Sequence, residues 1–160
     1  MKRTWIVAHD FSAEADFAAR VAVRDLLDGN APATLILVHA YHVVPVAAGF
    51  DGATTTTAWY PAVERTTAAE SAQRLQHVAQ TLRDEITRLR ANTDAPTIDV
   101  EIMVSNESPA EGIIAAADAR SAHRIVVGTH GRTGLSHLLL GSVAERVVRT
   151  AHVPVLVAKA

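Results

Sequence analysis

The sequence predicts an α/β fold: a single domain built on a doubly wound, five-stranded parallel sheet, with helices on both faces. Three observations lead to this prediction. Short apolar runs alternate with amphipathic segments along the chain. Most of the apolar runs lack polar alternation, which is typical of strands that are buried on both faces. The chain has 160 residues, a length that most often forms one domain, here residues 1–160.

Five segments have the composition of strands. Four of them are continuous apolar runs rich in β-branched residues, TWIVAHD, ATLILVHAY, HRIVVG and VPVLVAK, whereas TIDVEIMVS alternates and predicts one less buried face. In chain order they are residues 4–10, 33–41, 97–105, 123–128 and 153–159. We expect the last strand at one end of the sheet, where an apolar edge invites pairing.

Four segments predict helices, at residues 12–30, 62–90, 108–122 and 141–151. The first begins with Ser12 as a plausible N-cap and ends at the sequence DGN. The long second helix has an alanine-rich apolar stripe that suits packing on a sheet. In the third, Ser108 at the N-cap, Pro109 and Glu111 form the pattern of a capping box.

The segment at residues 44–61 has no sustained periodicity. It contains two prolines, two glycines and four consecutive threonines. We therefore expect a long mobile loop or lid between the second strand and the second helix.

Composition excludes several classes of function. The net charge of −2 gives no electrostatic footprint for nucleic acid or an anionic membrane. The absence of cysteine excludes disulfides, thiolate nucleophiles and cysteine-based metal sites. The eight histidines lack the close spacing of a zinc or iron site. No apolar run is long enough for a signal peptide or a membrane span, so we expect a cytoplasmic protein without membrane insertion.

Half of the eight glycines lie in the segment GTHGRTGLSHLLLGS, residues 128–142. This segment follows a predicted strand and precedes a predicted helix, at the edge of the sheet where ligands bind in open α/β folds. Glycines let the backbone approach a phosphate closely, and the free N–H groups at a helix start favour an anion. The segment therefore predicts a phosphate-binding site.

Neither standard phosphate fingerprint is present. There is no GxxxxGK[ST] motif, and the only lysines are Lys2 and Lys159. The first strand ends in AHDFS, without the GxGxxG of a dinucleotide-binding turn.

The spacing Gly128-x2-Gly131-x9-Gly141-Ser142, together with WIVAHDFS, LILVHA and the terminal VPVLVAK, resembles the universal stress protein family and specifically its ATP-binding branch. The resemblance covers nearly the whole chain. It implies a Rossmann-like fold of the adenine nucleotide alpha hydrolase type. It also implies a nucleotide-dependent sensor or regulator in the stress response, with at most weak ATP hydrolysis.

The resemblance also implies a role for individual residues. Asp10 would contact the ribose or a Mg²⁺ or Mn²⁺ ion that bridges phosphate oxygens, and the backbone at Ala40 would read the adenine edge. The implied nucleotide-binding set is Ala8, His9 and Asp10 beside the adenosine, Ala40 at the adenine edge, Val127 and Gly128 on the ribose side, Thr129, His130, Gly131 and Arg132 around the triphosphate, and Gly141, Ser142 and Val143 holding it.

Simpler interpretations of several of these residues stay open. Asp10 or Ser142 could serve only as a helix N-cap, and Arg132 could be a solvated surface charge. His39 is better interpreted as a packed, hydrogen-bonded histidine than as a ligand. His130 could face the ligand or have no contact with it.

Two alternative functions also stay open: a slow ATPase or phosphotransferase, for which only Asp10 and His130 could supply a catalytic group, and a module that binds AMP or cyclic AMP. The resemblance further implies a homodimer formed by antiparallel pairing of residues 153–159 and an unknown regulatory protein partner.

Overall fold

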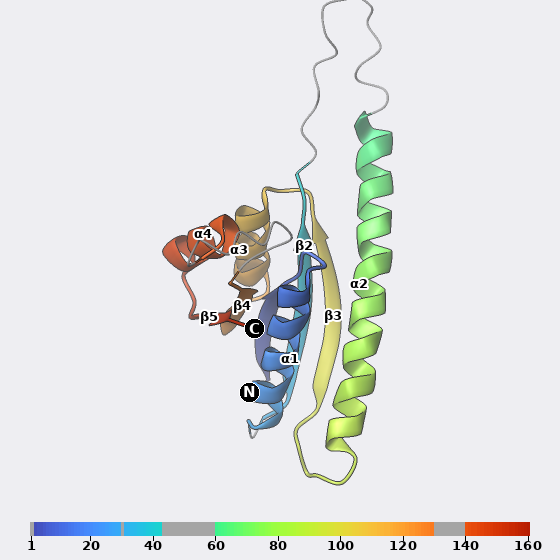
Figure 1. The fold of residues 1–160 in the computed structure, drawn as a ribbon, viewed down its shortest axis with the longest axis vertical. Coiled ribbons are helices and arrows are strands. Elements are labelled where there is room, and N and C mark those ends of the chain that lie inside the picture. The colour runs from blue at the N-terminus through green and yellow to red at the C-terminus, as the bar shows by residue number, and fades with distance from the viewer. Residues whose placement is uncertain (1, 30, 43–59, 130–139) are drawn as a thin grey trace, which may run out of the picture.

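The computed structural model describes residues 2–29, 31–42, 60–129 and 140–160. The strands are β1 (Arg3–Ala8), β2 (Ala33–Ala40), β3 (Ile98–Ser105), β4 (Arg124–Gly128) and β5 (Val155–Ala158). The helices are α1 (Ala13–Leu27), α2 (Tyr60–Arg90), α3 (Pro109–Ala119) and α4 (Ser142–Thr150). Each falls on a segment predicted for it, with ends that coincide with the prediction or differ by at most three residues (Figure 1).

All strands run parallel, in the order β3-β2-β1-β4-β5. The chain proceeds from β1 to β2 and β3 in one direction and then crosses to β4 and β5 on the other side of β1. The predicted fold class, a five-stranded parallel sheet of the doubly wound kind, is confirmed. The order reverses between β1 and β4, and such a switch point leaves a crevice at the carboxyl ends of the strands.

Both faces of the sheet are buried, which explains the continuous apolar runs. Side chains alternate across a strand, so Trp5 and Val7 join the core beneath α1 and α2, whereas Ile6 and Ile125 join the core beneath α3 and α4. α2 lies along β3, on the far side of the sheet from α3 and α4 (Figure 1). β5 lies at one end of the sheet, as predicted. None of the described helices is long and apolar enough to cross a membrane.

The helix starts differ partly from the sequence prediction. Ser12 Oγ accepts the backbone N–H of Ala15, so Ser12 caps α1 as predicted. The prediction of a capping box at α3 is wrong, because Ser108 makes no side-chain capping bond. Its hydroxyl instead donates to Glu111 Oε2 at 2.5 Å, since a carboxylate is the stronger acceptor within reach.

Two predicted boundaries also change. α3 ends at Ala119, ahead of Ser121, which has a positive φ of 45°. α2 begins at Tyr60, so the last two residues of the predicted loop at 44–61 are helical. Residues 43–59 lie outside the described residues, and the loop there stays a prediction.

Gly112 lets α3 pack closely on the ends of β2 and β3. A Cβ atom at this position would lie 2.7 Å from Ser105 Oγ and 2.8 Å from the Cβ of Ala40. The serine side chain can rotate, but the Ala40 Cβ is fixed to a buried strand. The absence of a side chain at Gly112 therefore sets the distance between α3 and the carboxyl end of β2.

We predict that Gly112→Ala destabilises the protein. Overpacking costs about 1–3 kcal/mol, which outweighs the gain of about 1 kcal/mol from replacing a helical glycine. Urea unfolding should show a net loss of about 1 kcal/mol. Ala115→Gly, at an exposed position of the same helix, measures the propensity term alone. A stabilised Gly112→Ala variant would show that the close approach does not constrain the helix.

Candidate functional site

A cavity of about 330 Å³ lies at the carboxyl ends of β1, β2 and β4, beside the first turns of α3 and α4. This is the edge of the sheet at which the strand order reverses. Its lining combines apolar side chains with a few polar groups, which is the usual character of a small-molecule site. The lining residues are Ala8, His9, Asp10, Ala15, Val38, His39, Ala40, Pro109, Ile113, Val127, Gly128, Thr129, Gly141, Ser142, Val143 and Ala144.

The cavity brings together every described residue of the predicted set. These residues are Ala8, His9, Asp10, Ala40, Val127, Gly128, Thr129, Gly141, Ser142 and Val143. His130, Gly131 and Arg132 lie outside the described residues, and their roles stay predictions.

Sequence reasoning missed part of the apolar wall. Val38 lies two residues before Ala40, and strand alternation places both on one face, so this residue could have been found. Pro109 and Ile113 come from α3. Pro109 belongs to the predicted capping-box pattern, which does not indicate a ligand, and no motif marks Ile113.

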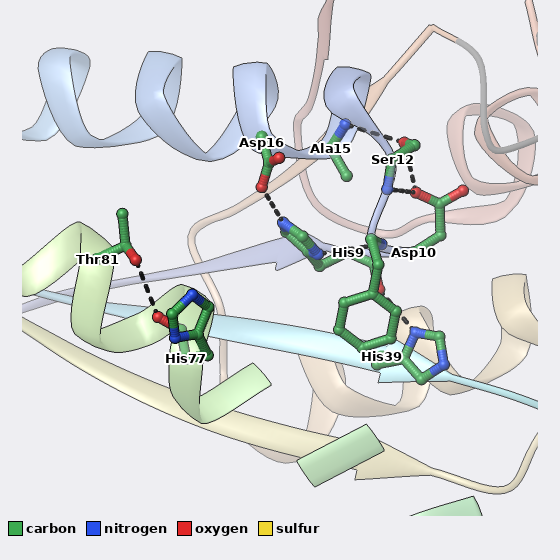
Figure 2. Close-up of polar contacts among 9 residues, drawn as sticks. His9, Asp10, Ser12, Ala15, Asp16, His39, His77 and Thr81 are labelled. Carbon is green, nitrogen blue, oxygen red and sulfur yellow. Dashed lines mark hydrogen bonds and ion pairs between the residues drawn. The ribbon is translucent and has the colours of Figure 1, made fainter. Parts of the chain in front are cut away.

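The turn between β1 and α1 is held by a chain of polar contacts (Figure 2). Asp10 Oδ1 accepts the backbone N–H of Ser12 at 3.1 Å and its hydroxyl at 2.6 Å. Ser12 Oγ in turn accepts the Ala15 N–H at 3.2 Å. The interpretation of Asp10 as the N-cap of α1 is therefore wrong, because Asp10 orients the serine that performs this role.

His9 turns its side chain towards α1 and is fully buried (Figure 2). Its Nδ1 accepts the backbone N–H of Phe11 at 3.2 Å, so the neutral ring carries its proton on Nε2. That proton is donated to Asp16 Oδ1 at 3.1 Å. His9 thus helps to shape the cavity through its position in the turn, while its imidazole is engaged elsewhere.

His39 is the packed, hydrogen-bonded histidine that the sequence suggested. It is buried, and its Nδ1 donates to the carbonyl of His9 at 2.8 Å. The backbone N–H of His9 donates to Val38 O, also at 2.8 Å. Both backbone groups of His9, its N–H and its carbonyl, are therefore hydrogen-bonded to the end of β2.

The glycine-rich segment begins and ends at the cavity. Gly141 N donates to Thr129 O at 2.7 Å, so the last residues of this segment meet the end of β4. α4 starts at Ser142, with Gly141 as its N-cap and no side-chain capping bond. The interpretation of Ser142 as a plain N-cap is therefore wrong. The N–H groups of the first turn, which a helix leaves without intrahelical partners, lie beside the cavity.

Gly128 has a packing role of its own. A Cβ atom there would lie 3.2 Å from the backbone carbon and oxygen of Glu14. The end of β4 therefore packs tightly on the first turn of α1. Packing alone accounts for this glycine, and its approach to a phosphate stays a prediction.

We predict that stability falls as the pH drops below about 6.5, the usual pKa of histidine. Burial lowers the pKa of His9, an effect that the Asp16 carboxylate opposes in part. The unfolded chain then binds a proton more readily than the folded one. The contribution of His9 is therefore complete above the unfolded pKa and is lost as the pH falls from there to the lower folded pKa. Urea midpoints at pH 7.5 and 5.5 measure this loss.

His9→Asn is the control for that measurement, because it keeps an acceptor beside Phe11 but does not titrate. The difference between the two midpoints should shrink in this variant. An unchanged difference would assign the pH dependence to other groups.

Comparison with known proteins gives the family. The model of the Universal stress protein family matches residues 1–159. A universal stress protein of Thermus aquaticus is 33% identical over 159 residues, which cover 99% of this chain and 100% of the relative. A universal stress protein of Methanocaldococcus jannaschii is 57% identical over 51 residues, 32% of this chain and only 30% of that relative.

Solved structures share the fold. A universal stress protein crystallised in complex with cAMP superposes with a TM-score of 0.59 at 22% identity, over 98% of this chain and 96% of that one. At this identity the likeness concerns the fold alone. The family match and the full-length relative together show that the chain belongs to the universal stress protein family.

Proposed function

We propose that this chain binds an adenine nucleotide, foremost ATP with Mg²⁺ or Mn²⁺, and acts as a nucleotide-dependent sensor or regulator in the stress response. The observation that carries the proposal is the cavity itself. It joins an apolar wall, the carboxylate of Asp10 and the start of α4 at the switch point of a parallel sheet. The structural relative crystallised with cAMP supports the choice of nucleotide class.

The two sides of the cavity suit the two ends of a nucleotide. Val38, Ala40 and Ile113 form an apolar wall that would accept a purine. We assign recognition of the purine edge to the Ala40 backbone. Gly141, Ser142 and Val143 would bind phosphate through backbone N–H groups at the positive end of the α4 dipole. Thr129 also lines the cavity, and His130, Gly131 and Arg132 would complete the phosphate loop.

The donor chemistry fits a metal ion held jointly with phosphate. Among the described residues, no three histidine or carboxylate side chains gather closely enough to hold an ion by themselves. A single carboxylate is nevertheless what Mg²⁺ commonly takes from a protein when a nucleotide supplies the other oxygens. We assign that role to Asp10, and the ion would offset phosphate charge.

Binding is favoured over an enzymatic function. Hydrolysis needs a base or a group that positions water at the γ-phosphate. Asp10 Oδ1 already accepts two hydrogen bonds from Ser12, which suits a structural and binding role better than that of a base. We therefore propose at most weak hydrolysis.

A homodimer belongs to the same proposal. β5 pairs with β4 along one edge, and no described strand pairs with its other edge. Val155, Leu156 and Val157 are only partly buried there. Antiparallel pairing of two β5 strands would cover this edge. The molar mass of the particle in solution, which should be twice that of one chain, tests this pairing.

We predict that Mg·ATP stabilises the protein against heat. Ligand at about 100 times Kd contributes roughly 2.7 kcal/mol, which raises Tm by about 5–10 °C for a domain of this size. ADP, AMP and cyclic AMP, measured alongside, rank the nucleotides. Asp10→Asn should lose at least half of the shift, because it removes the charge proposed to meet the ribose or the ion.

The matched control is Asp99→Asn, which removes an exposed carboxylate near the amino end of β3, where it pairs with Lys2. This variant should keep the full shift. Absence of a shift with all four nucleotides would refute the proposed function.

A further inference from the structure

Phe11 occupies a conformation that its side chain disfavours. Its φ is 67°, and Phe11 and Ser121 are the non-glycine residues with positive φ in the described part of the chain. For a bulky residue the left-handed region brings Cβ too close to the backbone, so neighbouring contacts must hold it there. Phe11 lies in the middle of the turn that lines the cavity with Asp10.

Four contacts hold this conformation, and one of them is an edge-on packing of the His9 ring against the Phe11 ring, with 5.6 Å between the centroids. His9 Nδ1 accepts the Phe11 N–H at 3.2 Å. The Phe11 ring lies 4.5 Å from the His39 ring, centroid to centroid, and the Arg74 guanidinium carbon of α2 lies 3.8 Å from the Phe11 centroid. Of these contacts, only the hydrogen bond to His9 Nδ1 involves the Phe11 backbone, so it acts directly on the course of the chain at this residue.

The His9 ring is itself immobilised. It is fully buried, and the bond from Nε2 to Asp16 Oδ1 fixes which nitrogen faces Phe11. The ring therefore connects α1, through Asp16, to the turn, through Phe11. Asp10 lies between His9 and Phe11, and the same turn brings its carboxylate to the cavity and to Ser12.

We propose that His9 is a positioning residue of the nucleotide site: by holding Phe11 in the left-handed turn, it fixes the carboxylate of Asp10 for the ribose or the metal ion. This inference rests on the proposed function and gives the His9 side chain a role in which it acts without touching the ligand. Its imidazole faces α1, so any effect on affinity must pass through the turn.

Calorimetric titration with Mg·ATP tests the inference on three variants. His9→Leu removes the acceptor and should weaken the affinity by about tenfold, the scale of one hydrogen bond. His9→Asn places an amide oxygen close to the position of Nδ1 and should recover most of the affinity, with a loss of about threefold or less.

The third variant, His123→Leu, is the matched control. His123 Nδ1 accepts the backbone N–H of Thr4 at 3.2 Å, the same kind of bond at the amino end of β1. It should lower Tm without weakening binding. Equal losses of affinity in His9→Leu and His123→Leu would overturn the inference, because general stability would then explain both.

A double-mutant cycle tests the route through Asp10. If His9 acts on the carboxylate, His9→Leu should weaken binding by less than about twofold in an Asp10→Asn background, since coupled residues are not additive. A tenfold loss in both backgrounds would overturn the inference.

Hydrogen exchange of the Phe11 amide, measured without nucleotide, separates this inference from the proposed function. Protection should be lost in His9→Leu and kept in His9→Asn. That outcome supports the turn even if the wild-type chain binds no nucleotide and the proposed function fails. Equal protection in both variants overturns the inference even if nucleotide binds.

Discussion

The burial of β1 in the middle of a parallel sheet determines where a ligand can bind. β1 pairs with β2 on one side and β4 on the other, and Trp5, Ile6 and Val7 have almost no exposed surface. Because the chain leaves β1 and β4 towards helices on opposite faces, α1 and α4 diverge at the carboxyl ends of these strands. The space that they leave open is the cavity.

The opening is bordered by a turn that several hydrogen bonds hold in place. The His9 peptide bonds both to Val38 O and to the His39 ring, and its side chain fixes Phe11 in a conformation that would otherwise be unfavourable. Strain of this kind persists only where its surroundings determine it, and it is frequent at binding sites. Gly112 and Gly128 serve the same end, because each lets a helix approach the end of a strand closely.

The sequence allowed the fold and much of the cavity to be predicted, for reasons visible in particular residues. Continuous runs such as LILVHA indicate strands with two buried faces. The glycine spacing predicted that Gly128, Gly141 and Ser142 belong to one site, and all three line the cavity. What could not be predicted is how individual side chains orient. The positive φ of Phe11 and the orientation of the His9 ring have no sequence pattern. Ser108 and Glu111 do form a pattern, but it predicts a cap and not the bond between their side chains.

The central claim is that the cavity at the switch point receives the nucleotide, and amide chemical shifts of ¹⁵N-labelled protein titrated with Mg·ATP test it most directly. The largest changes should fall on Asp10, Ala40 and the start of α4 at Gly141–Val143. The groove on the outer side of α3 and α4, lined by Glu107, Asp118 and Thr150, should change little. Changes centred on that groove, or none at the switch point, would contradict the account.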